Sequence, residues 1–101
     1  MRRLKLDVHV VDLASSEHKR FPSGTPFKNL ALSIKRRKYP FKVLLFSGND
    51  LIYVAECDGE KGVFREPTPP GYYTMTYPPV LKLIEFSTKD QLLEILAEYV
   101  L

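Results

Sequence analysis

Hydrophobic and polar positions are spaced along this chain in a way that predicts several β-strands and two helices. The central stretch, 41–57, reads FKVLLFSGNDLIYVAEC and contains two apolar runs, 43–46 and 51–55. Between them lies Ser-Gly-Asn-Asp, which favours a tight turn because Gly and Asn adopt positive φ at little cost, so the stretch predicts a β-hairpin. Neither run alternates with polar residues, as is typical of strands buried on both faces. We therefore expect the hairpin at the centre of a sheet with both faces covered.

The N-terminal stretch, 3–13, has a period of two and predicts a half-buried strand. Its apolar positions share one face and are Leu4, Leu6, Val8 and Val10. The following residues, 14–24, are polar and end in Pro-Ser-Gly, a composition that predicts a loop.

A helix is expected next, with Thr25 as its N-cap and Pro26 at its first position, where a missing N–H costs nothing. Its apolar stripe has the spacing i, i+3, i+4, i+7 and comprises Phe27, Leu30, Ala31 and Ile34. Pro40 prevents the helix from continuing. A right-handed crossover through this helix would set the first strand parallel to the strand at 41–46.

After the hairpin, short strands are expected at 63–65 and 80–86. A last helix follows Ser87 or Thr88, with Asp90 or Gln91 completing a capping box. The sequence thus predicts one small α+β domain over residues 1–101. A mostly antiparallel sheet of five or six strands would carry two helices, in the order β-α-β-β-β-(β)-β-α, where the strand in brackets is an optional edge strand at 72–77.

Composition narrows the class of protein. The chain has 101 residues, of which 45% are hydrophobic and 27% charged, and no apolar run approaches the roughly 18 residues of a membrane span. We therefore expect a cytoplasmic protein. Its single cysteine excludes an internal disulfide and a multi-cysteine metal site. Few side-chain amides and many charged residues fit a heat-adapted source.

The charges are divided unevenly between the two ends of the chain. Residues 1–42 contain 11 Lys and Arg against three acidic residues, a net charge of +8, whereas residues 43–101 carry −5. A basic region of this size indicates a phosphate-bearing or other acidic partner. Folding could instead bring the two halves together so that their fields cancel, or the halves of two copies could associate head to tail.

The basic end of the first helix is the leading candidate site. Its cations could neutralise several phosphates of a nucleic acid, and the tyrosine that follows could stack on a base. The expected nucleic-acid-binding residues are Lys19, Arg20, Lys28, Lys35, Arg36, Arg37, Lys38, Tyr39 and Lys42. The alternative is a solvated helix end whose cations serve the helix dipole and solubility.

A second candidate is the segment 66–79, EPTPPGYYTMTYPP, which holds five of the eight prolines. Its rigid aromatic side chains suit a binding surface, so Tyr72, Tyr73 and Tyr77 are expected partner-binding residues. With the apolar C-terminus, the segment favours a protein–protein interaction module or a homo-oligomeric adaptor as the alternative function. A loop folded back on the sheet edge would also explain it.

Residues able to support catalysis do not form a convincing constellation. The tripeptide Glu17-His18-Lys19 has the E-x-K spacing of metal-dependent nucleases, but it falls in an expected loop. Asp7 and His9 share the outward face of the first strand without a third metal ligand at a telling spacing. Cys57 ends an apolar strand and is interpreted as a core residue. We therefore predict a small non-enzymatic binding protein with no catalytic residue, metal or cofactor.

Overall fold

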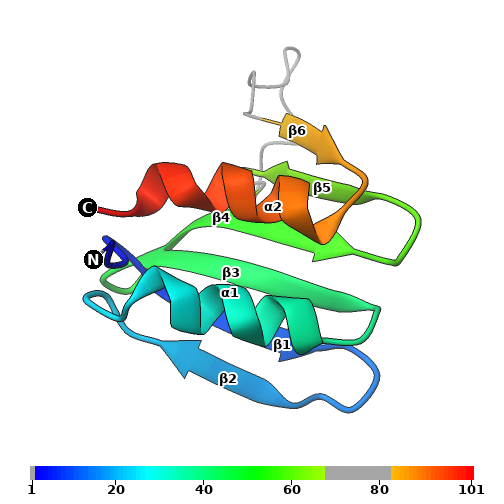
Figure 1. Cartoon of the computed structure of the whole chain (residues 1–101), viewed down its shortest axis with the longest axis horizontal. Coiled ribbons are helices and arrows are strands. Elements are labelled where there is room, and N and C mark those ends of the chain that lie inside the picture. The colour runs from blue at the N-terminus through cyan, green and yellow to red at the C-terminus, as the bar shows by residue number, and fades with distance from the viewer. Residues whose placement is uncertain (1, 68–82) are drawn as a thin grey trace, which may run out of the picture.

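A computed structural model describes residues 2–67 and 83–101, which adopt the predicted α+β fold (Figure 1). The described strands are β1 (Asp7–Asp12), β2 (His18–Phe21), β3 (Phe41–Ser47), β4 (Asp50–Cys57), β5 (Gly62–Arg65) and β6 (Leu83–Phe86). The helices are α1 (Phe27–Arg36) and α2 (Lys89–Leu96), and α2 continues into the short 3-10 helix η2 (Ala97–Tyr99). The order of strands and helices confirms the predicted fold class.

The sheet of the described residues is antiparallel throughout, with the strand order β2-β1-β3-β4-β5-β6. The hairpin of β3 and β4 occupies its middle, as predicted. Gly48 opens the turn with φ of 62°, a backbone conformation that costs glycine least.

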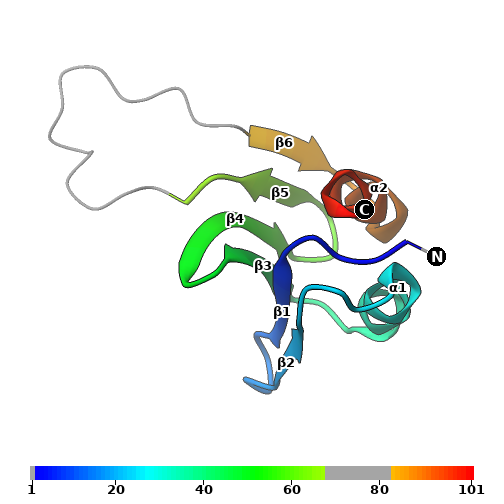
Figure 2. The same cartoon turned by 90° about the vertical axis from the view of Figure 1, so that its left-hand side faces the viewer.

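Both helices lie on the same face of the sheet (Figure 2). Their apolar stripes and the inward residues of the strands form one buried cluster. Phe41, Val43 and Leu45 of β3 are at its centre and are fully buried, packed with Leu30 of α1 and Leu92 of α2 in the same cluster. Burial of large apolar side chains is the main stabilising contribution here.

The described helices cover one face of the sheet, and neither α1 nor α2 reaches the second face, so cover of both faces stays a prediction. Strand register places Val11, Leu44 and Phe46 on that face, where they are half-buried by their neighbours. Val54 is also on it, buried but outside the main core cluster. Continuous apolar runs in β3 and β4 therefore reflect two apolar faces, only one of which carries helices.

The predicted parallel pairing of β1 and β3 is also wrong, since the two strands are antiparallel. The cause is β2, which occupies part of the segment expected to be a loop. It returns antiparallel to β1 before the chain enters α1. The helical crossover therefore joins β2 to β3, two parallel strands with β1 between them.

The two helix starts differ in how well the sequence predicted them. Thr25 does not cap α1: its hydroxyl donates to the Pro22 carbonyl at 2.6 Å, and Pro26 is the N-cap residue, without a side-chain cap. In α2, by contrast, Thr88 and Gln91 form the predicted capping box.

The two ends of the described chain lie side by side. The Leu101 N–H donates to the Arg3 carbonyl at 2.8 Å, and the Lys5 N–H donates to the Tyr99 carbonyl at 2.9 Å. The expected partner-binding residues Tyr72, Tyr73 and Tyr77 lie outside the described residues. Neither described helix is long and apolar enough to cross a membrane.

Candidate nucleic-acid interface

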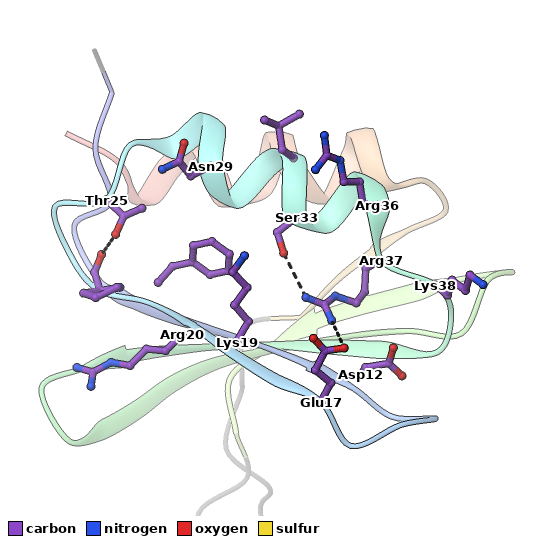
Figure 3. A pocket seen from close by; sticks show the side chains of 13 residues that line it. Asp12, Glu17, Lys19, Arg20, Thr25, Asn29, Ser33, Arg36, Arg37 and Lys38 are labelled. Atoms are coloured by element: carbon purple, nitrogen blue, oxygen red, sulfur yellow. Dashed lines mark hydrogen bonds and ion pairs between the residues drawn. The ribbon is translucent and has the colours of Figure 1, made fainter.

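A groove of about 710 Å³ runs between β2 and α1, and we call it the basic groove (Figure 3). Five of the nine cationic and aromatic residues expected to bind nucleic acid line it. Its lining residues are Asp12, Glu17, Lys19, Arg20, Phe21, Pro22, Thr25, Asn29, Leu32, Ser33, Arg36, Arg37 and Lys38. Segments separated in the sequence by α1 thus contribute cations to one surface.

The register of β2 forms the floor of the basic groove. Lys19 pairs with Val10, and Phe21 pairs with Val8, so both side chains face α1. Phe21 is buried and anchors the strand to the core, while Lys19 is exposed and points toward the helix (Figure 3). One apolar residue in this polar strand is enough to dock it beside α1.

Arg37 joins the two walls of the basic groove. Its Nη2 donates to the Ser33 hydroxyl at 3.3 Å, and its Nη1 lies 3.8 Å from Oε2 of Glu17. The Arg37 side chain is only 11% exposed, and its Nε is buried without a hydrogen-bond partner. The contacts with Ser33 and Glu17 hold the guanidinium in place. Its buried Nε has no hydrogen-bond partner, which costs free energy of folding.

The other cations surround the opening of the groove rather than its floor. Arg36 and Lys38 lie where α1 ends, as Figure 3 shows. Arg20 turns toward the opposite face of the sheet, where its Nη2 lies 3.5 Å from Oδ2 of Asp7. Among the described residues, Lys19, Arg36 and Lys38 form no ion pair. The groove therefore retains positive charge after folding.

The ion pairs bear on whether the acidic half of the chain cancels the basic half. Arg37 and Arg20 pair with acids of the basic half, at Glu17 and Asp7, while Arg65 pairs with Glu56 within the acidic half. Each of these pairs joins residues of the same half. None of these three pairs sets an acid of residues 43–101 against a cation of the basic groove.

The two acids of the groove serve local structure. The Asp12 carboxylate accepts the N–H groups of Ala14 at 2.9 Å and Ser15 at 3.1 Å, which closes the β1–β2 turn. Both hydrogen bonds lower the pKa of Asp12, and the bond from Ser15 has the larger effect. The E-x-K lysine, Lys19, does fall on a strand, contrary to expectation. Its partner Glu17, however, is directed at Arg37 rather than at a shared metal position.

Four expected binding residues do not line the basic groove: Lys28, Lys35, Tyr39 and Lys42. The Tyr39 ring stacks on Phe41 with centroids 5.6 Å apart, and the Nζ of Lys89 lies 4.9 Å from its centre. Lys42 is on the second face of the sheet, opposite Glu56 of β4. Tyr39 thus packs on one side at the end of α1 and stays 40% exposed.

Sequence reasoning missed Lys89 altogether. Its Nζ donates to the carbonyls of Arg37 at 2.5 Å and Lys35 at 3.2 Å, so the first residue of α2 satisfies the last carbonyls of α1. A cation in the first turn of a helix is unfavourable for that helix's own dipole, and this could have marked it as a residue with another partner.

Cys57 is confirmed as a core residue. Burial, more than the nearby charge of Asp58, raises the pKa of its thiol to about 12 against the opposing charge of Lys89. A thiol that stays protonated at neutral pH is a poor nucleophile.

No group of three or more His, Cys, Asp or Glu in the described residues is arranged to hold a metal ion. Comparison with protein-family models, curated proteins and solved structures gives no significant match, so the candidate interface rests on the geometry of this chain alone.

Proposed function

We propose that this chain is a small non-enzymatic nucleic-acid-binding protein that receives the phosphate backbone at the basic groove. The observation that carries the proposal is that cations from two separate elements, β2 and the end of α1, line the same groove. Lys19 from β2 and Arg36, Arg37 and Lys38 from the end of α1 surround one open groove, although the sequence separates them by 16 residues or more. Clustered cations of this kind bind phosphates with release of counterions.

The proposed contact is with the backbone rather than with bases. Among the groove residues the one aromatic ring is Phe21, which is 5% exposed, and Tyr39 packs elsewhere. Without an exposed ring, base stacking cannot supply affinity there. We therefore propose binding with little sequence preference, by a protein that acts in the cytoplasm.

The first test is fluorescence anisotropy with labelled single-stranded and double-stranded oligonucleotides at 50 and 200 mM salt. Four phosphate contacts predict a loss of affinity on the order of 100-fold on duplex over this range. Absence of binding at the lower salt concentration would contradict the proposal.

A matched pair of variants locates the binding surface. Arg36→Gln combined with Lys38→Gln removes two charges from the groove, and Lys42→Gln combined with Lys61→Gln removes two from outside it. We expect the first pair to reduce both affinity and the salt slope, the slope by about two contacts, and the second pair to change them much less. Equal effects would indicate attraction to net charge alone.

A second candidate function is association with another protein, most simply a second copy of this chain. The observation in its favour is the exposure of two apolar residues of the acidic half, with Leu101 78% exposed and Leu83 58% exposed. Such association would tolerate salt and would weaken when Tyr72 and Tyr73 are replaced by serine. Sedimentation of the full chain at both salt concentrations distinguishes it from the first proposal.

A further inference from the structure

The two histidines of this chain meet on the second face of the sheet. His9 lies on β1 and His18 on β2, and the register sets them diagonally across the two strands. The Nδ1 of His9 and the Nε2 of His18 are hydrogen-bonded at 2.8 Å, so one of these nitrogens donates a proton to the other, and the ring centroids are 4.8 Å apart. Residues nine positions apart in the sequence thus present two ring nitrogens to one point.

The neighbouring side chains fix His9 and leave space beside it. Its ring packs against Phe46 with centroids 4.7 Å apart, whereas His18 is exposed. A hollow of about 210 Å³ adjoins His9, lined also by Asp7, Arg20 and the β3–β4 turn. One imidazole is therefore held by packing, and the other can turn at little cost.

We propose that His9 Nδ1 and His18 Nε2 form a two-imidazole chelate for a divalent late transition metal that prefers tetragonal coordination, Cu²⁺ or Ni²⁺. Imidazole nitrogens bind such metals at about 2.0 Å. If a metal ion displaced the proton that the two nitrogens share and left them 2.8 Å apart, they would subtend an angle of about 90° at the metal, the angle of a square-planar or octahedral site. A tetrahedral zinc site would need them about 3.3 Å apart.

The protonation and charge around the pair are compatible with a cation. Burial, followed by the charges of His18 and Arg20, lowers the pKa of His9 against the opposing charge of Asp7. Arg20 is itself paired with Asp7, which offsets its repulsion.

Water would complete the coordination. The Asp7 carboxylate already accepts the Ser23 N–H at 2.7 Å and faces Arg20, so it is not counted as a ligand. The adjoining hollow has room for water molecules next to His9. The proposal is independent of nucleic-acid binding, because the pair lies on the face opposite α1.

The test is a titration of the full-length chain with Cu²⁺ buffered by glycine, followed by pulsed electron paramagnetic resonance. We expect one Cu²⁺ per chain with the nitrogen modulation of two equatorial imidazoles. Since the chain has no third histidine, this signature reports the pair directly. Binding with one imidazole or none would overturn the proposal.

Variants separate the chelate from other copper ligands such as the N-terminal amine. His18→Gln and His9→Gln should each weaken Cu²⁺ binding by about tenfold or more, because the second imidazole adds to affinity only when both are present. Lys19→Gln, the neighbour that points to the opposite face, should leave it unchanged. If both histidine variants bind as the wild type does, the pair is not the site.

Discussion

Arg37 shows how one side chain can both build a binding surface and restrict it. Its guanidinium spans the basic groove between Ser33 and Glu17, with one buried nitrogen left unsatisfied. Glu17 is 69% exposed, so its ion pair with Arg37 adds little stability. Its carboxylate nevertheless lies where a phosphate oxygen would be attracted. In the proposed function, Glu17 competes with the ligand.

This competition predicts that Glu17→Gln binds nucleic acid more tightly than the wild type. A unit charge about 4 Å away in water is worth about 1 kcal/mol, which corresponds to an increase of about fivefold in affinity at low salt. The control is Glu60→Gln, an acid in the exposed β4–β5 turn, which should have a much smaller effect. Anisotropy at 50 mM salt measures both, and unchanged or weaker binding by the Glu17 variant would refute the competition.

Single residues also mark the limit of prediction from sequence. Tyr39 follows a basic run and was expected to stack on a base; Phe41 and Lys89 contact its ring, which is still 40% exposed, so base stacking stays a prediction. His18 was placed in a loop, and its contact with His9 depends on pairing that local composition does not reveal. The contacts of His18 with His9 and of Tyr39 with Lys89 both depend on how the elements pack, which the local sequence does not show.

At the level of elements, β2 determines most of what the sequence did not predict. Three of its four residues are polar and exposed, and only Phe21 is buried, so this edge strand has the composition of a loop. Missing it led to the wrong direction for β3 relative to β1. It also concealed that Lys19 lies across from Arg36 and Arg37 at the groove. The positions of α1, α2 and the central hairpin were predicted correctly, because their apolar stripes, apolar runs and turn residues lie in the local sequence.

Contact between α1 and α2 yields a prediction about stability. Lys89→Gln removes the ammonium that binds the last carbonyls of α1, and hydrogen bonds from charged donors contribute about 1.5–3 kcal/mol. Because this site is partly exposed, we expect the free energy of unfolding to fall by about 1–2 kcal/mol.

Urea unfolding followed by circular dichroism measures the change, and Lys61→Gln, in an exposed turn, should alter it by less than about 0.5 kcal/mol. A similar loss for both lysines would show that Lys89 is not a specific cap.

In the whole molecule, the strand order determines which charged groups lie on each side of the sheet. The β2–α1 side carries the basic groove and α2 carries acidic residues, while the second sheet face holds the histidine pair. Within the described residues, the ion pairs of Arg37 and Arg20 are made with acids of residues 1–42, at Glu17 and Asp7. The expected nucleic-acid interface is thereby narrowed to the part of the basic region that lies between β2 and the end of α1.

The most direct test of this account is a ¹H–¹⁵N correlation spectrum of the full chain, recorded during titration with the oligonucleotide that binds more tightly in anisotropy. We predict that the backbone amides of residues 18–21 and 36–38 shift most, and that those of the turn at 58–62 stay in place. Shifts concentrated on that turn or on the second sheet face, or no shifts at all, would contradict the basic groove as the nucleic-acid interface.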